Sequence, residues 1–96
     1  MDESLPAAEL AEIERTLRCD TRLLGFHRLR TRKSGGDRQV DVHIVLPGEL
    51  TLAEAHRIAV ELEQAIGALF PRTHVVTHVD PHTVVPGAGA GSVQLP

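Results

Sequence analysis

The chain has 96 residues, of which 42% are hydrophobic and 24% charged, and this length accommodates one compact domain with a modest core and excludes a second. A formal net charge of -3 argues against a general binder of polyanions. The single cysteine, Cys19, excludes an intrachain disulfide, and no apolar run approaches the roughly 18 residues of a membrane span, so we expect the chain as given to be soluble.

The first half of the sequence predicts a helix followed by a β-hairpin. Residues 6–18 carry Leu10, Ile13 and Leu17 at helical spacing. Residues 25–33 and 39–46 alternate in polarity, and the Ser-Gly-Gly-Asp sequence between them is typical of a tight turn.

The second half predicts a helix, a strand and a tail. Thr51 and Glu54 have the spacing of a capping box, which starts a helix that Pro71 stops. Residues 74–79 then read as a third strand. We predict a domain over residues 1–82 and a disordered tail over residues 83–96, which are rich in Gly, Ala and Pro.

This order of elements predicts an α+β domain. The hairpin makes its two strands antiparallel, and the helical crossover makes the last strand a parallel neighbour of the second. The result is a three-stranded mixed sheet with both helices on one face. The open face of so small a sheet predicts a partner subunit.

Histidines and one aspartate fall where they could meet on that open face. If the apolar positions of the second strand face the helices, His43 points to the open side, and His78 and Asp80 share one side of the third strand. His27 could add a ligand from the first strand. Imidazole nitrogen and carboxylate oxygen suit a borderline divalent cation such as zinc. The alternative is that these are ordinary surface histidines, because spacing alone is a weak signal.

The remaining histidines and the cysteine are weaker candidates for metal ligands. His56 lies beside the apolar stripe of the second predicted helix, where it is either an exposed histidine or a ligand donated across a dimer. His74 is about 13 Å along the strand from His78, too far for the same ion. His82 could swing toward the metal, and Cys19 is expected to be a small buried residue rather than a ligand.

A local basic stretch contains Arg28, Arg30 and Arg32. Nucleic-acid binding is rejected, because the aromatic side chains that stack on bases are missing. Salt bridges to acids, or display to an anionic membrane surface, fit the composition better.

Several separated motifs resemble the cytoplasmic C-terminal domain of cation diffusion facilitators, the efflux transporters of zinc, iron, manganese or cadmium. The motifs are His27 to Gly35, Val42-His43, Leu52 to His56, and His78 to Pro81. The resemblance implies a metallochaperone-like (ferredoxin-like) fold, a homodimer, and attachment to the transmembrane domain of the same transporter, on the cytoplasmic side of the inner membrane. The opening residues resemble the segment after the last transmembrane helix, so we expect an excised domain or one read from an internal methionine.

The resemblance also implies a ligand set and a role. His27, His43, His78 and Asp80 match the ligands of one subunit, and His56 matches the ligand from its neighbour. The expected function is regulatory and not enzymatic: Zn²⁺, or Cd²⁺, Fe²⁺ or Mn²⁺, closes the dimer and promotes proton-coupled metal efflux. A stand-alone metal-binding protein or metallochaperone is the alternative, and a metallohydrolase the enzyme rival. Arg28 departs from the family, where an acid is frequent.

Overall fold

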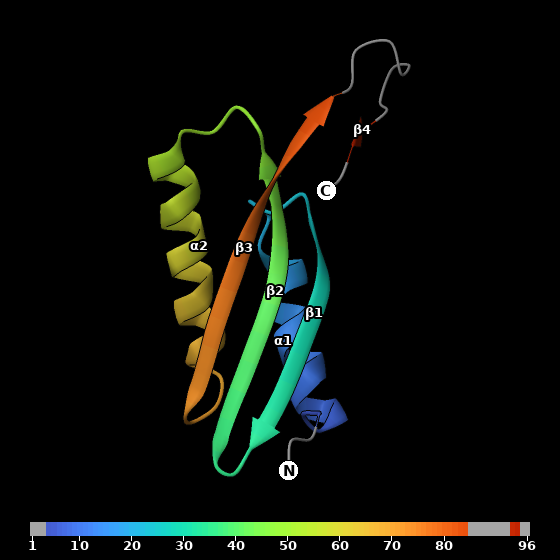
Figure 1. Cartoon of the computed structure of the whole chain (residues 1–96), viewed down its shortest axis with the longest axis vertical. Coiled ribbons are helices and arrows are strands. Elements are labelled where there is room, and N and C mark those ends of the chain that lie inside the picture. Colours follow the sequence, from blue (N-terminus) through green and yellow to red (C-terminus); the bar gives the residue numbers. More distant parts are fainter. Residues whose placement is uncertain (1–3, 85–92, 95–96) are drawn as a thin grey trace.

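A computed structural model describes residues 4–84 and 93–94 of the chain (Figure 1). Its elements are, in order, α1 (Ala7–Cys19), β1 (Gly25–Ser34), β2 (Asp37–Pro47), α2 (Leu52–Gly67), β3 (Thr73–Val84) and β4 (Val93–Gln94). β1 pairs with β2 antiparallel, β2 with β3 parallel, and the short β4 with the end of β3 antiparallel. The predicted α+β order with a mixed sheet is therefore confirmed, and β4 adds a two-residue edge to it.

Local chemistry sets where the elements begin and turn. The Thr51 hydroxyl accepts a hydrogen bond from the backbone N–H of Glu54 at 3.1 Å, and the Glu54 carboxylate accepts one from the backbone N–H of Thr51 at 3.0 Å. This capping box satisfies two backbone donors that the first turn of α2 would otherwise leave free, as the sequence predicted. In the hairpin turn, Gly35 has a φ of +61°, which a residue without Cβ adopts at little cost.

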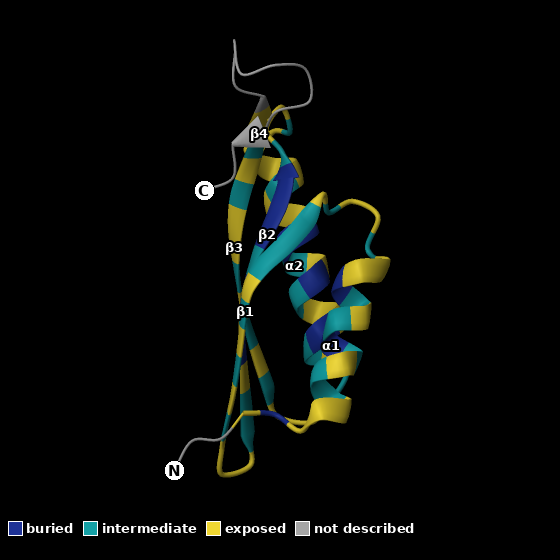
Figure 2. Ribbon diagram, turned by 90° about the vertical axis from the view of Figure 1, so that its right-hand side faces the viewer, coloured by how far each residue is buried: buried dark blue, intermediate teal, exposed yellow. Residues whose placement is uncertain are grey.

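Both helices pack on one face of the sheet, and Figure 2 shows them on the same side of the strands. The core between the layers is aliphatic, with both helices and the central strand contributing most of its side chains. Its most deeply buried members are Ile13, Leu17, Val40, Val42, Ile44, Leu46, Leu62 and Ile66. The predicted inward side of β2 is therefore confirmed, and the residues between those positions belong to the open face.

A β-bulge interrupts β1. His27 pairs with His43 and Arg30 pairs with Asp41, so three steps along β1 match two steps along β2. Arg28, inside the bulge, has a φ of +53°. Strict alternation would put His27 and Arg30 on opposite faces, but the extra residue brings both to the open face. The alternating pattern predicted for the whole of residues 25–33 therefore holds only on either side of the bulge.

Two further expectations differ from the structure. Cys19 is exposed, not buried, because it follows Leu17 by about 200° around the helix and so leaves the inward stripe of α1. β3 is longer than predicted and continues through Val84, inside the expected tail over residues 83–96. Apart from residues 93–94, the rest of that tail lies outside the described residues. None of the described helices has the length and apolar character needed to cross a membrane.

Candidate metal centre

Each of the three long strands contributes one donor to a cluster on the open face. His27 comes from β1, His43 from β2 and Asp80 from β3, and one possible ligand atom of each lies within 4.8 Å of the others. The His27 Nε2 atom is 2.7 Å from Asp80 Oδ2, and the His43 Nδ1 atom is 3.1 Å from the same oxygen. The sheet register explains why these three side chains lie together. It pairs His27 with His43 and His43 with His78, and Asp80 follows His78 by two residues on the same side of β3.

The carboxylate at the centre of this cluster favours its charged form. The Asp80 side chain is only 14% exposed, and burial acts to raise its pKa. The hydrogen bonds from His27 and His43, with the charges of the two rings, outweigh burial and lower the pKa below its ordinary value. A carboxylate accepts hydrogen bonds, so in this arrangement both ring nitrogens donate to it.

The donor set fits a borderline divalent metal ion. Two imidazole nitrogens and one carboxylate oxygen are ligands that zinc takes in proteins. Ligand atoms of a tetrahedral zinc site lie about 3.3 Å apart, given bonds of about 2.0–2.1 Å. The 2.7 and 3.1 Å separations of His27 and His43 from Asp80 therefore need only a small expansion. Three protein donors leave a fourth position for water or for another ligand.

His78 lies beside this group without joining it. Its ring stacks on that of His43, with centroids 4.5 Å apart and planes 17° from parallel. Its Nε2 atom contacts Asp41 Oδ1 at 2.8 Å. Asp41 is the residue that the sequence reading missed. It lies two positions before His43 on β2, so the same alternation that selected His43 also points to it.

The other histidines lie elsewhere. His56 is exposed on α2, whose packed face covers the side of the sheet opposite the cluster. His74 pairs with Asp37 at 3.3 Å near the hairpin turn. His82 is half-buried near the end of β3, where its carbonyl accepts a hydrogen bond from the backbone of Gly48 at 3.1 Å.

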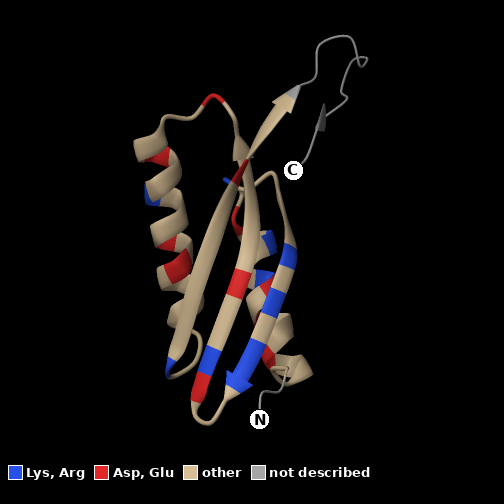
Figure 3. Cartoon of the chain, viewed as in Figure 1, with Lys and Arg blue, Asp and Glu red and all other residues tan. Residues whose placement is uncertain are grey.

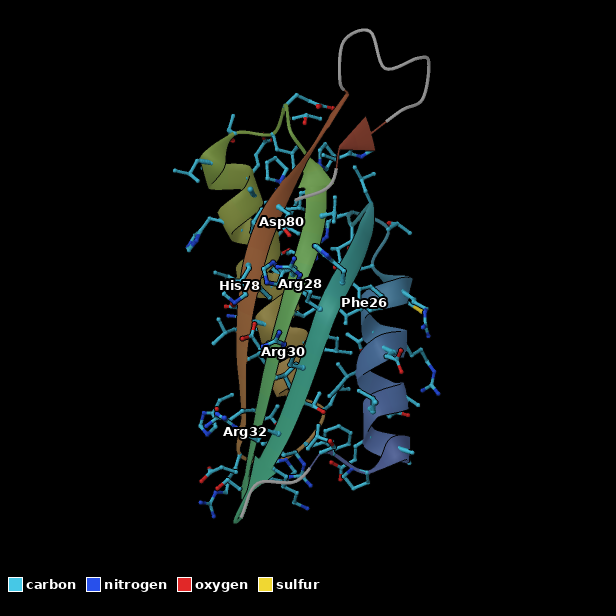
Figure 4. All side chains as sticks on the ribbon, turned by 45° about the vertical axis from the view of Figure 1, so that its right-hand side comes forward. Phe26, Arg28, Arg30, Arg32, His78 and Asp80 are labelled. Atoms are coloured by element: carbon cyan, nitrogen blue, oxygen red, sulfur yellow. The ribbon has the colours of Figure 1, made fainter. Side chains whose placement is uncertain are left out.

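Positive charge borders the cluster. Figure 3 marks Lys and Arg positions in blue along β1 toward the hairpin turn, with an acidic position in red on β2 beside them. Figure 4 shows Arg28 over the same sheet face as His78 and Asp80, and Arg30 and Arg32 further along that face. Arg28 follows His27 directly in sequence and lies inside the bulge. A metal ion in the cluster would therefore bind close to a guanidinium group.

Comparison with known proteins identifies the fold and the family. The profile described as "Cation efflux protein, cytoplasmic domain" matches residues 5–82. The cation-efflux pump FieF of Klebsiella pneumoniae subsp. pneumoniae is 40% identical over 91 residues, covering 95% of this chain and 30% of the pump. FieF of Salmonella schwarzengrund is 40% identical over 89 residues, covering 93% of this chain and 30% of that pump. The chain thus spans less than a third of the length of the curated relatives it matches.

Solved structures of transporter domains have the same fold. A structure of the transporter CzrB has a TM-score of 0.75 at 36% identity, covering 82% of this chain and 99% of the CzrB chain. The metal-bound C-terminal domain of the CzcD transporter from Thermotoga maritima has a TM-score of 0.71, covers 80% of this chain and 94% of that domain, and at 22% identity shows the shared fold. With the profile matching most of its length, the chain belongs to the family of cytoplasmic domains of cation efflux proteins.

Proposed function

We propose that this domain binds Zn²⁺, or a similar divalent cation, at His27, His43 and Asp80, and that it does so as a homodimer. One observation carries the proposal: donors from three strands converge on one carboxylate oxygen, at 2.7 and 3.1 Å. The Zn form of CzrB, which is 36% identical, and the metal-bound domain of CzcD support the choice of a metal ion as the bound species.

The homodimer is supported by the surface on which the cluster lies. The three donors are on the sheet face that the helices do not cover, and an uncovered face on so small a sheet is where a second copy could pack. His56 is exposed on the far side of the sheet, which favours a role at the site of a second copy over a role at its own. In this proposal His78 completes the metal-binding group within one chain, and His56 of the second copy joins it.

The regulatory step is a difference in metal affinity between two arrangements of the dimer. Without metal, facing histidines and carboxylates gain little from approaching each other. A bound ion that takes ligands from both copies favours the closed arrangement by its extra affinity for that arrangement. In a full-length transporter, whose membrane part moves metal in exchange for protons, closure would promote efflux when cytosolic metal is high.

A zinc titration tests the proposal directly. Isothermal calorimetry on metal-free protein should give saturable heat, and small-angle scattering at saturation should show a more compact dimer. His56→Ala should keep zinc binding to the three-strand cluster but lose the compaction, with His74→Ala as the matched control on an exposed histidine. Absence of binding heat and of any zinc peak in anomalous maps from soaked crystals would contradict the metal site. A monomer at every protein concentration would contradict the dimer.

A further inference from the structure

Asp41 is a charged residue of the open face that the three-donor cluster does not use. It precedes His43 by two positions on β2, so both side chains project from the same face. The register aligns His43 with His78, which makes Asp41 and His78 diagonal neighbours across β2 and β3. Their contact, from Asp41 Oδ1 to His78 Nε2, is 2.8 Å long.

The orientation of Asp41 is informative because a different partner is available. Arg30 lies directly opposite Asp41 in the register of β1 and β2. A guanidinium is a strong partner for a carboxylate, yet the Asp41 carboxylate lies within hydrogen-bonding distance of the imidazole of His78. The contact therefore joins an acid to the one open-face histidine that stacks on the candidate metal ligand His43.

Two contacts together fix the ring of His78. Stacking on His43, with planes 17° from parallel, sets the tilt of the ring, and the Asp41 contact sets its rotation. A carboxylate only accepts hydrogen bonds, so a His78 ring that bonds to Asp41 through Nε2 carries its proton on that atom. In a neutral imidazole the other nitrogen, Nδ1, then offers its lone pair. Histidines that bind metals commonly donate their second N–H to a carboxylate in this way.

We infer that Asp41 is a positioning residue for the metal centre, which holds His78 in the form that binds the ion through Nδ1. The inference rests on the proposed function, since it assumes that the cluster binds zinc. It adds a residue that touches no ligand atom of the three-donor group and acts only through His78.

The test compares zinc affinities of the wild type and three variants by competition with a chromophoric chelator. Asp41→Ala removes the acceptor and should weaken zinc binding about 10- to 100-fold, the usual cost of losing such a partner. Asp41→Asn keeps an acceptor oxygen and should lose less than about fivefold, because a neutral acceptor retains much of the hydrogen bond. Asp37→Ala is the matched control: it removes an acid of the same strand, which contacts another β3 histidine at 3.3 Å, and should leave the affinity unchanged.

The outcomes separate the inference from the proposed function. If the wild type binds no zinc, the proposed function fails. If the wild type binds and Asp41→Ala binds equally well, the inference alone fails. Equal losses in Asp41→Asn and Asp41→Ala would also overturn it, since Asp41 would then act through its charge or as a ligand. ¹⁵N spectra of the zinc-loaded wild type give an independent readout, in which His78 should keep a proton on Nε2, and a metal-bound Nε2 would refute the inference.

Discussion

Replacing Asp80 by asparagine tests the centre of the proposed metal site. Asp80 accepts hydrogen bonds from His27 and His43, so the substitution removes the negative charge on which both rings converge while keeping the side-chain shape. Structural zinc sites of four ligands bind with about 10–16 kcal/mol, or about 3 kcal/mol for each ligand, so losing one should weaken binding about 100-fold.

Thermal unfolding converts this loss into a measurable shift. At a free zinc concentration 100 times the wild-type Kd, binding stabilises the wild type by about 2.7 kcal/mol, and a variant with 100-fold weaker affinity by only about 0.4 kcal/mol. For a domain of this size, 1 kcal/mol corresponds to about 4–8 °C in Tm. Zinc should therefore raise the Tm of the wild type by roughly 10–20 °C and that of Asp80→Asn by about 2–3 °C.

The assay is scanning calorimetry with and without zinc, with chelator added back to reverse the shift. Metal-free Asp80→Asn should unfold a few degrees below the wild type, because weakening two partly buried hydrogen bonds costs about 1 kcal/mol. Asp37→Asn is the control: Asp37 also contacts a histidine and an arginine, but near the hairpin turn, so its zinc shift should equal that of the wild type. A full wild-type shift in Asp80→Asn would refute the assignment of Asp80 as a ligand.

Three other predictions follow from named contacts. Zinc affinity should fall in acid, because protons compete with the metal ion for the ligand atoms. The metal-free fold should persist to lower pH. The pKa of Asp80 is lowered in the folded state, and the hydrogen bond from Arg38 lowers the pKa of Glu9. The stability that these carboxylates contribute is therefore present above their unfolded-state pKa values and is lost only as the pH falls through their folded-state pKa values. Calorimetric titration and circular dichroism across pH should therefore give two separate transitions, and a single shared transition would contradict this. Arg28→Asn should tighten zinc binding roughly fivefold, because repulsion between a nearby surface charge and the metal ion amounts to about 1 kcal/mol. Arg28→Lys keeps the charge and should leave the affinity unchanged. An Arg28→Asn affinity equal to that of the wild type would show that the cation is too remote to matter. Leu62→Ala should lower the free energy of unfolding by about 2–5 kcal/mol in urea, because the side chain is 1% exposed, while Leu52→Ala, at 86% exposed, should change it by less than about 0.5 kcal/mol. Similar losses in the two would place Leu62 outside the core.

The elements were predictable because their signals are local. Alternation of apolar residues over the second strand, and the Thr51–Glu54 capping box, depend only on neighbours in sequence, and both are confirmed. The same alternation puts His43 on the open face, and the helical crossover makes β3 its parallel neighbour. The pairing of His43 and Asp80 could thus be inferred before any coordinates.

The bulge in β1 could not be inferred in this way. Positive φ angles are commonest at glycine, asparagine and aspartate, and Arg28 has none of their freedom. Nothing in its sequence neighbourhood marks the extra residue, because a bulge is decided by pairing with β2. Its strand position makes His27 only a possible further ligand, and the family resemblance implies that it is one; the bulge is the physical reason that it shares a face with Arg30.

The geometry of one chain also limits where a metal-driven movement can arise. His27 and His43 both contact Asp80 within one chain, and the sheet ladder fixes the three strands that carry them. Binding at these donors needs a small expansion and the displacement of the ring protons, but little movement of the backbone. A ligand produces a conformational change only through different affinities for two states. Because the sheet of one chain holds these three donors together, the proposed regulation depends on His56 of a second copy more than on the cluster itself.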